Sequence, residues 1–104
     1  GVVRVIVEAM GLHPGDQHVQ EEGCSFMKSL AEDGEDGSEL GIMIASLGGI
    51  EAIVRAIKLH PGSWGCFFNG CWALAGIARN DDIGAKIAAN GGIQAILEAM
   101  EMHP

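Results

Sequence analysis

Apolar residues follow a helical spacing in three similar segments of the chain. In the middle segment the apolar positions fall at i, i+3, i+4 and i+7: Ile50, Ile53, Val54 and Ile57. The last segment repeats this spacing: Ile93, Ile96, Leu97 and Met100. A stripe of this kind is typical of a helix that is buried on one side. We therefore predict a helix in each segment, ended by the turn that the His-Pro pairs at 13–14, 60–61 and 103–104 introduce.

The chain also repeats itself. A shift of 43 positions superposes residues 48–61 on 91–104 with eight identities in fourteen. A shift of 47 positions superposes residues 6–31 on 53–78, including Leu-His-Pro-Gly and Gly-Cys. The four-residue difference between these two shifts falls in the acidic stretch 32–39, as expected for an insertion in a loop. We predict an incomplete first repeat at 1–47 with this insertion, a complete repeat at 48–90 and the start of a third at 91–104.

Three helices are predicted within each repeat. Ser38 or Asp81 caps a short first helix, at 39–46 or 82–89. This helix ends at a Gly-Gly pair, 48–49 or 91–92, which supplies a left-handed residue. After the second helix, Asp16 or Ser63 caps a longer third helix, at 17–32 or 64–79. The predicted buried positions of the third helix are Val19, Gly23, Cys24, Met27, Leu30 and Ala31, aligned with Cys66, Gly70, Cys71, Leu74, Ile77 and Ala78.

The three-helix unit, its Gly-Gly and Pro-Gly breaks and the segment GCWALAGIA resemble the armadillo repeat. The resemblance covers the whole chain and implies an all-α, right-handed α-solenoid whose third helices line a groove that binds other proteins. In the nuclear-import and junctional members, a Trp and an Asn four residues later hold the bound peptide. Trp72 matches the Trp, but Gly76 stands at the Asn position, and the first repeat has Ser25 and Ser29 there. Binding of a nuclear-localisation-type peptide is therefore not expected.

Four of the five aromatic residues lie within nine positions of the second repeat's third helix. Trp64, Phe68 and Trp72 are spaced i, i+4 and i+8, so they share one side of the helix. The equivalent positions of the first repeat, 17, 21 and 25, are polar, so these sites are not obligatory core. Exposed aromatic clusters form binding hot spots. The alternative is that the aromatic residues pack under a neighbouring repeat or the flanking chain. The predicted partner-binding residues are Trp64, Phe67, Phe68, Trp72 and Gly76.

The net charge of −8 is unfavourable for binding phosphate backbones or anionic lipid headgroups, so we expect neither nucleic acid nor an anionic membrane as partner. No apolar run reaches the length of a membrane span. The acidic stretch does not follow the order of an EF-hand calcium loop and is predicted to be a solvated loop. Its possible contacts to a basic partner are Glu32, Asp33, Glu35 and Asp36.

Candidate chemistry is sparse in this sequence. The repeated histidines are His13, His60 and His103. Because each repeat has one of them, they are expected to lie too far apart to bind one zinc ion. Each is expected to form hydrogen bonds with free carbonyls at the end of its own helix. Three cysteines without CxxC spacing favour neither a disulfide framework nor a zinc site, which indicates a reducing, intracellular compartment. Nucleotide-binding and hydrolase motifs are missing. We predict no metal, no cofactor and no catalytic residue.

The predicted function is that of a non-catalytic protein-interaction scaffold, an adaptor or a structural subunit of a larger assembly. Two alternatives remain: the substrate-recruiting arm of a larger enzyme, and a docking subunit of a membrane-associated complex. Repeat proteins normally need several units with polar end caps. Both ends of this sequence are apolar, so we expect the chain to be part of a longer chain or of a hetero-complex.

Overall fold

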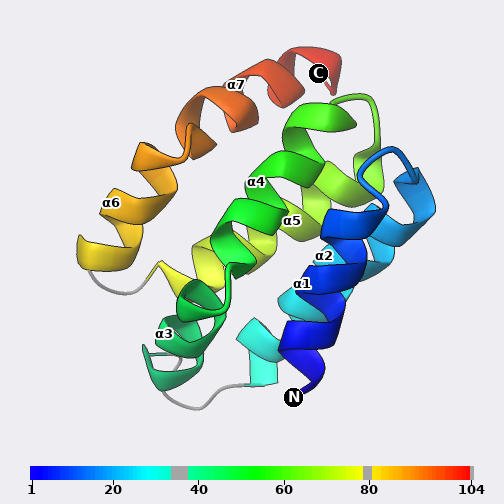
Figure 1. Cartoon of the computed structure of the whole chain (residues 1–104). Helices are drawn as coiled ribbons and strands as arrows, with labels where there is room; N and C mark the ends of the chain where they lie inside the picture. The colour runs from blue at the N-terminus through cyan, green and yellow to red at the C-terminus, as the bar shows by residue number, and fades with distance from the viewer. Residues whose placement is uncertain (34–37, 79–80, 104) are drawn as a thin grey trace.

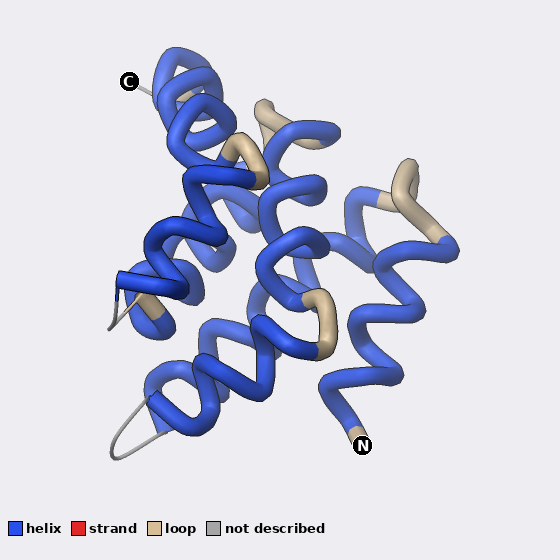
Figure 2. The backbone as a smooth tube through the Cα atoms, turned by 60° about the vertical axis from the view of Figure 1, so that its left-hand side comes forward, coloured by secondary structure: helices blue, strands red, loops and turns tan. Residues whose placement is uncertain are grey.

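The computed structural model describes residues 1–33, 38–78 and 81–103 (Figure 1). All regular structure in these ranges is helical, which confirms the all-α prediction (Figure 2). The described helices are α1 (Val2–Leu12), α2 (Gln17–Asp33), α3 (Ser38–Ser46), α4 (Gly49–Leu59), α5 (Trp64–Ile77), α6 (Asp81–Ala89) and α7 (Gly92–Met102).

Helices at equivalent positions of the sequence repeat lie beside one another. The second helices form the series α1, α4, α7, with α4 in contact with both of the others (Figure 1). The third helices, α2 and α5, pack along each other more extensively than any other pair, and α3 contacts α6. The result is a body of 32 × 26 × 22 Å built from three sets of neighbouring helices.

The glycine pairs end the first helices as predicted. Gly48 has φ 87° and Gly91 has φ 78°, both in the left-handed region that favours glycine. The second glycine of each pair is needed for a different reason. A Cβ on Gly49 would lie 2.8 Å from the Ile44 carbonyl oxygen, so the chain can turn back on α3 only without a side chain there.

The third helices begin with the predicted caps. Asp16 Oδ1 accepts the Val19 N–H at 3.2 Å, and Ser63 Oγ accepts the Cys66 N–H at 3.0 Å. The prediction for the first helices was wrong by one residue. Ser38 and Asp81 are the first residues of α3 and α6 and therefore lie inside the helices that they were expected to precede.

The repeated histidines make contacts that differ from the prediction. His60 Nε2 donates to the Pro14 carbonyl at 2.8 Å, and His103 Nε2 donates to the Pro61 carbonyl at 2.9 Å. Each ring thus bonds the turn of the preceding repeat, where a carbonyl of its own helix end was expected. The reason is tertiary: α1, α4 and α7 lie side by side, which brings each Pro-Gly turn next to the following histidine.

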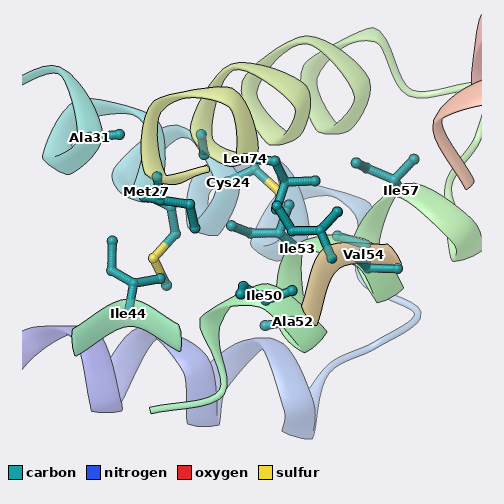
Figure 3. Close-up of a cluster of buried hydrophobic side chains, with 14 of the residues drawn as sticks. Cys24, Met27, Ala31, Ile44, Ile50, Ala52, Ile53, Val54, Ile57 and Leu74 are labelled. Atoms are coloured by element: carbon teal, nitrogen blue, oxygen red, sulfur yellow. The ribbon is translucent and has the colours of Figure 1, made fainter. Parts of the chain in front are cut away.

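The core lies where α2, α4 and α5 meet, with α3 closing one side (Figure 3). The predicted stripe of α4 is buried throughout. Most of the predicted third-helix face is buried as well, although Val19, Leu30 and Cys71 are half-buried and Ala78 is exposed. Gly70 allows α5 to lie close to α4, because a Cβ there would lie 2.9 Å from Ile57 Cδ1 and would require the Ile57 side chain to shift.

The same stripe in α7 has a different environment. Ile93 is 59% exposed, whereas its repeat equivalent Ile50 is fully buried, and Leu97 and Met100 are also more than half exposed. The prediction of one buried side therefore holds for α4 and fails for most of α7. The smaller residues of α7, Ala95 and Ala99, face the core.

No single helix in the described ranges is long and apolar enough to cross a membrane. Residues 39–46 of α3 and residues 49–59 of α4 reach the required length and composition only together, as a pair bent by 69°.

Candidate functional site

Three aromatic side chains on α5 form an exposed aromatic stripe, which we define as Trp64, Phe68 and Trp72. The ring centroids of Trp64 and Phe68 lie 5.6 Å apart in a stacked arrangement, and those of Phe68 and Trp72 lie 5.5 Å apart. Trp64 is 58% exposed, Phe68 38% and Trp72 47%. The comparison of the two repeats therefore identified correctly that these positions lie outside the core.

The opposite side of α5 explains why the stripe is exposed. Cys66, Ala73 and Ile77 are buried against the core, so residues spaced i, i+4 and i+8 from Trp64 point away from it.

Two hydrogen bonds of the Ser63 side chain hold the start of α5 in place. Ser63 caps the helix, and its hydroxyl donates to Glu21 Oε2 of α2 at 2.6 Å. A carboxylate at a helix N-terminus also interacts favourably with the helix dipole.

Phe67 is not part of the exposed stripe, although its ring centroid lies 5.8 Å from that of Trp64. It is half-buried and stacks on the His103 ring, with centroids 5.0 Å apart and an interplanar angle of 14°. Trp64 meets the same ring edge-on at 5.5 Å. The alternative interpretation, packing against a neighbouring repeat, thus describes Phe67 better than it describes Phe68 or Trp72.

Gly76 lies at a close approach of α5 to α2. A Cβ on Gly76 would stand 2.7 Å from Ala31 Cβ, and Ala31 is buried. Replacement by Asn would force the two helices apart. Gly76 therefore has a clear packing role, and its contact with a partner stays a prediction.

Lys28 lies beside the aromatic stripe, and the sequence pattern did not predict this position. Lys28 Nζ of α2 lies 5.2 Å from the Trp72 ring centroid and 5.9 Å from that of Phe68, which is cation–π geometry. The same ammonium pairs with Glu32 at 3.2 Å. Nothing in the sequence places Lys28 there, because the register of α2 on α5 is a tertiary property.

The acidic residues proposed to meet a basic partner are described only in part. Glu32 is exposed and carries the ion pair with Lys28. Asp33 is the last residue of α2, and its side chain lies outside what the structure describes. Glu35 and Asp36 lie outside the described residues.

The three cysteines are free thiols. Cys24 and Cys66 are fully buried and lie next to each other. A hydrogen bond to Cys66, together with burial, raises the pKa of the Cys24 thiol. Burial also raises the pKa of the Cys71 thiol. Within the described ranges, no group of three His, Cys, Asp or Glu side chains could hold a metal ion.

Two grooves lie away from the aromatic stripe. A groove of about 540 Å³ separates α3 from α6, and its walls include Ile42, Ile83 and Lys86. A second groove, of about 330 Å³, runs between α1 and α2. Neither groove contains a residue of the stripe.

Comparison with known proteins gives a partial similarity. No family model matches the chain, and no solved structure matches it. The chain is similar to Protein aardvark of Dictyostelium discoideum, with 35% identity over 86 residues. The match covers 78% of this chain and 11% of that protein, so the chain corresponds to a small part of its relative's length.

Proposed function

We propose that the chain is a segment of a right-handed α-solenoid of armadillo-like repeats and acts as a non-catalytic scaffold or adaptor. Its partner is a protein that binds the aromatic stripe of α5. Two observations support the repeat architecture: helices at equivalent sequence positions lie side by side, and each following histidine bonds the preceding Pro-Gly turn.

The observation that carries the binding proposal is the exposure of three contiguous aromatic rings on one helix. Exposed Trp and Phe side chains do not contribute the stabilisation that burial would give, and such residues are enriched in binding hot spots. The first repeat folds the equivalent helix with Gln17, Glu21 and Ser25 at these positions, so the fold does not require aromatic residues there. A partner accounts for them better than stability does.

The shape of the surface favours a macromolecular partner. The stripe lines neither of the two grooves described above, and small-molecule sites are normally concave. Lys28 already covers part of Trp72 and Phe68, while Trp64 is the most exposed ring of the three. We propose that Trp64 makes the first contact and that Lys28 moves along the stripe as the partner binds.

Tryptophan fluorescence tests this proposal directly, because Trp64 and Trp72 are the two tryptophans of the chain. Peptides selected from a displayed library against the whole chain are titrated while the emission is recorded. We expect selected peptides to shift the emission and to lose at least about tenfold in affinity for the triple variant Trp64→Gln, Phe68→Glu, Trp72→Ser. Binding to this variant is measured with labelled peptide.

The matched control changes exposed apolar residues of another face, Ile42→Gln with Met43→Gln on α3. Both variants must keep the helical circular dichroism of the parent chain. If the folded stripe variant binds the peptides as tightly as the parent, the stripe is not the binding surface and the proposal fails.

A further inference from the structure

The packing of α2 along α5 places two cysteines from different repeats side by side. The Ser63 hydroxyl donates to Glu21 Oε2 at 2.6 Å, which fixes the register of the two helices at the start of α5. Cys24 follows Glu21 by three positions, and Cys66 follows Ser63 by three positions. The two thiols therefore meet one step further along the same pair of helices. Both are fully buried.

The distance between the two helices suits a disulfide bond. Disulfide-bonded cysteines have their Cβ atoms about 3.5–4.5 Å apart. Further along α2 and α5, a Cβ on Gly76 would stand 2.7 Å from Ala31 Cβ, so the helices approach at least as closely as a disulfide requires. At the cysteines themselves, the Cys24 thiol donates a hydrogen bond to Cys66 Sγ. The two sulfurs are thus in contact before any bond forms.

We infer that Cys24 and Cys66 form a redox site, at which hydrogen peroxide converts the two thiols into an intramolecular disulfide that joins α2 to α5. The bond links the third helix of the first repeat to that of the second. The sequence spacing did not predict this pair, because its members are 42 positions apart. The inference goes beyond the proposed function, since it concerns the junction between repeats and not the aromatic stripe.

The surroundings give the two thiols different roles. The hydrogen bond from Cys24 lowers the pKa of the Cys66 thiol. Cys66 also lies in the first turn of α5, where the helix dipole favours a negative charge. The same hydrogen bond, together with burial, raises the pKa of the Cys24 thiol. Cys66 is therefore the thiol that ionises and reacts with the oxidant, and Cys24 is the thiol that completes the disulfide.

The reaction proceeds in two steps. The Cys66 thiolate attacks one peroxide oxygen, the O–O bond breaks, and hydroxide leaves with the electron pair, so that Cys66 becomes a sulfenic acid. The Cys24 sulfur then attacks Cys66 Sγ, which forms the S–S bond and expels the sulfenic hydroxyl as hydroxide. The two hydroxides take up the two thiol protons. Two thiols are thus oxidised, and one peroxide is reduced to two waters.

The third cysteine provides an internal comparison. Cys71 is half-buried and is therefore more exposed than either member of the pair. Burial raises the pKa of its thiol, and a protonated thiol is a poor nucleophile. Peroxide is small and neutral, so it reaches the buried pair through local openings of α2 from α5. We expect Cys71 to stay reduced while Cys24 and Cys66 are oxidised.

Peptide mapping of the full 104-residue chain tests the inference. The folded, reduced chain is treated with hydrogen peroxide, and the remaining thiols are alkylated in denaturant. Cleavage with chymotrypsin after Phe67 and Phe68 separates Cys66 from Cys71. We expect the number of alkylated cysteines to fall from three to one, with a peptide pair that joins Cys24 to Cys66. Dithiothreitol should restore all three thiols.

Two matched variants localise the bond. Cys71→Ala should still form it, whereas Cys66→Ala should leave Cys24 available for alkylation. Both variants must keep the helical circular dichroism of the parent, and the mapping of the parent chain itself depends on neither. Because the bond closes a loop of about 40 residues, the oxidised parent should melt about 10 °C above the reduced chain.

The inference is overturned if all three cysteines remain open to alkylation, if Cys24 joins Cys71, if the disulfide links separate chains, or if it forms only after the chain is unfolded. A disulfide that lowers the melting temperature also overturns it, because the native helices then do not accommodate the bond. None of these outcomes affects the stripe proposal, whose peptide titrations use the reduced chain.

Discussion

At the residue scale, the most informative side chains are those that link one repeat to the next. A proline turn leaves a carbonyl that the backbone of its own repeat does not use, and the imidazole Nε2–H of the following histidine satisfies it. Ser63 and Glu21 make a similar link at the start of α5. These contacts are short and directional, so they favour one register between neighbouring repeats.

The histidine link can be measured by comparing two equivalent positions. We expect His60→Ala to lower the free energy of unfolding by about 1 kcal/mol, because the Pro14 carbonyl loses its donor. His13 has the same place in its helix, but its ring is exposed and makes no such bond within the described residues. Urea unfolding of His13→Ala should therefore stay within about 0.5 kcal/mol of the parent. Equal losses in the two variants would argue against the link.

At the element scale, the helix boundaries follow from local stereochemistry. The left-handed φ of Gly48 and Gly91 and the capping oxygens of Asp16 and Ser63 act within a few residues of each break. The sequence pattern locates these breaks well for that reason. The one-residue error at Ser38 and Asp81 reflects how little distinguishes a capping residue from the first residue of a helix.

Two glycines should respond in opposite directions to replacement by alanine, because their backbone conformations differ. Gly48→Ala places a side chain on a residue with φ 87° and should lower the free energy of unfolding by about 1 kcal/mol. This cost comes from the backbone conformation alone, because the nearest side-chain atom, at 3.6 Å, leaves room for a Cβ. Gly84 lies inside α6 with open space around its Cα, so Gly84→Ala should stabilise by about 0.5–1 kcal/mol. Thermal unfolding of both variants gives the signs. A stabilising Gly48→Ala would show that the left-handed conformation is not required.

At the scale of the whole molecule, position in the stack of helices decides the environment of each repeat. The central helix α4 has neighbours on both sides, whereas α7 contacts α4 on one side and exposes its aliphatic stripe on the other. Identical residues at identical repeat positions therefore contribute differently to stability.

Ile50 and Ile93 provide the direct comparison. Ile50→Ala removes a fully buried side chain and should cost about 2–5 kcal/mol. Ile93→Ala removes one that is 59% exposed and should change the free energy of unfolding by less than about 0.5 kcal/mol. Chemical denaturation of the two variants measures both values. Similar costs would mean that the exposed side of α7 is covered in solution.

The sequence by itself determined the helices, their breaks and the internal repeat, because helix hydrogen bonds, caps and glycine conformations depend on residues a few positions apart. It also indicated that the α5 aromatics lie outside the core, since the first repeat has polar residues at the same places. Only the tertiary structure decided which residues meet across 40 or more positions: His60 with Pro14, Ser63 with Glu21, and Lys28 with Trp72. Only the tertiary structure, too, separated the buried stripe of α4 from the exposed one of α7. The physical reason is the same in each case, because contacts between helices depend on their register and on which neighbours are present, and neither is encoded in any single segment.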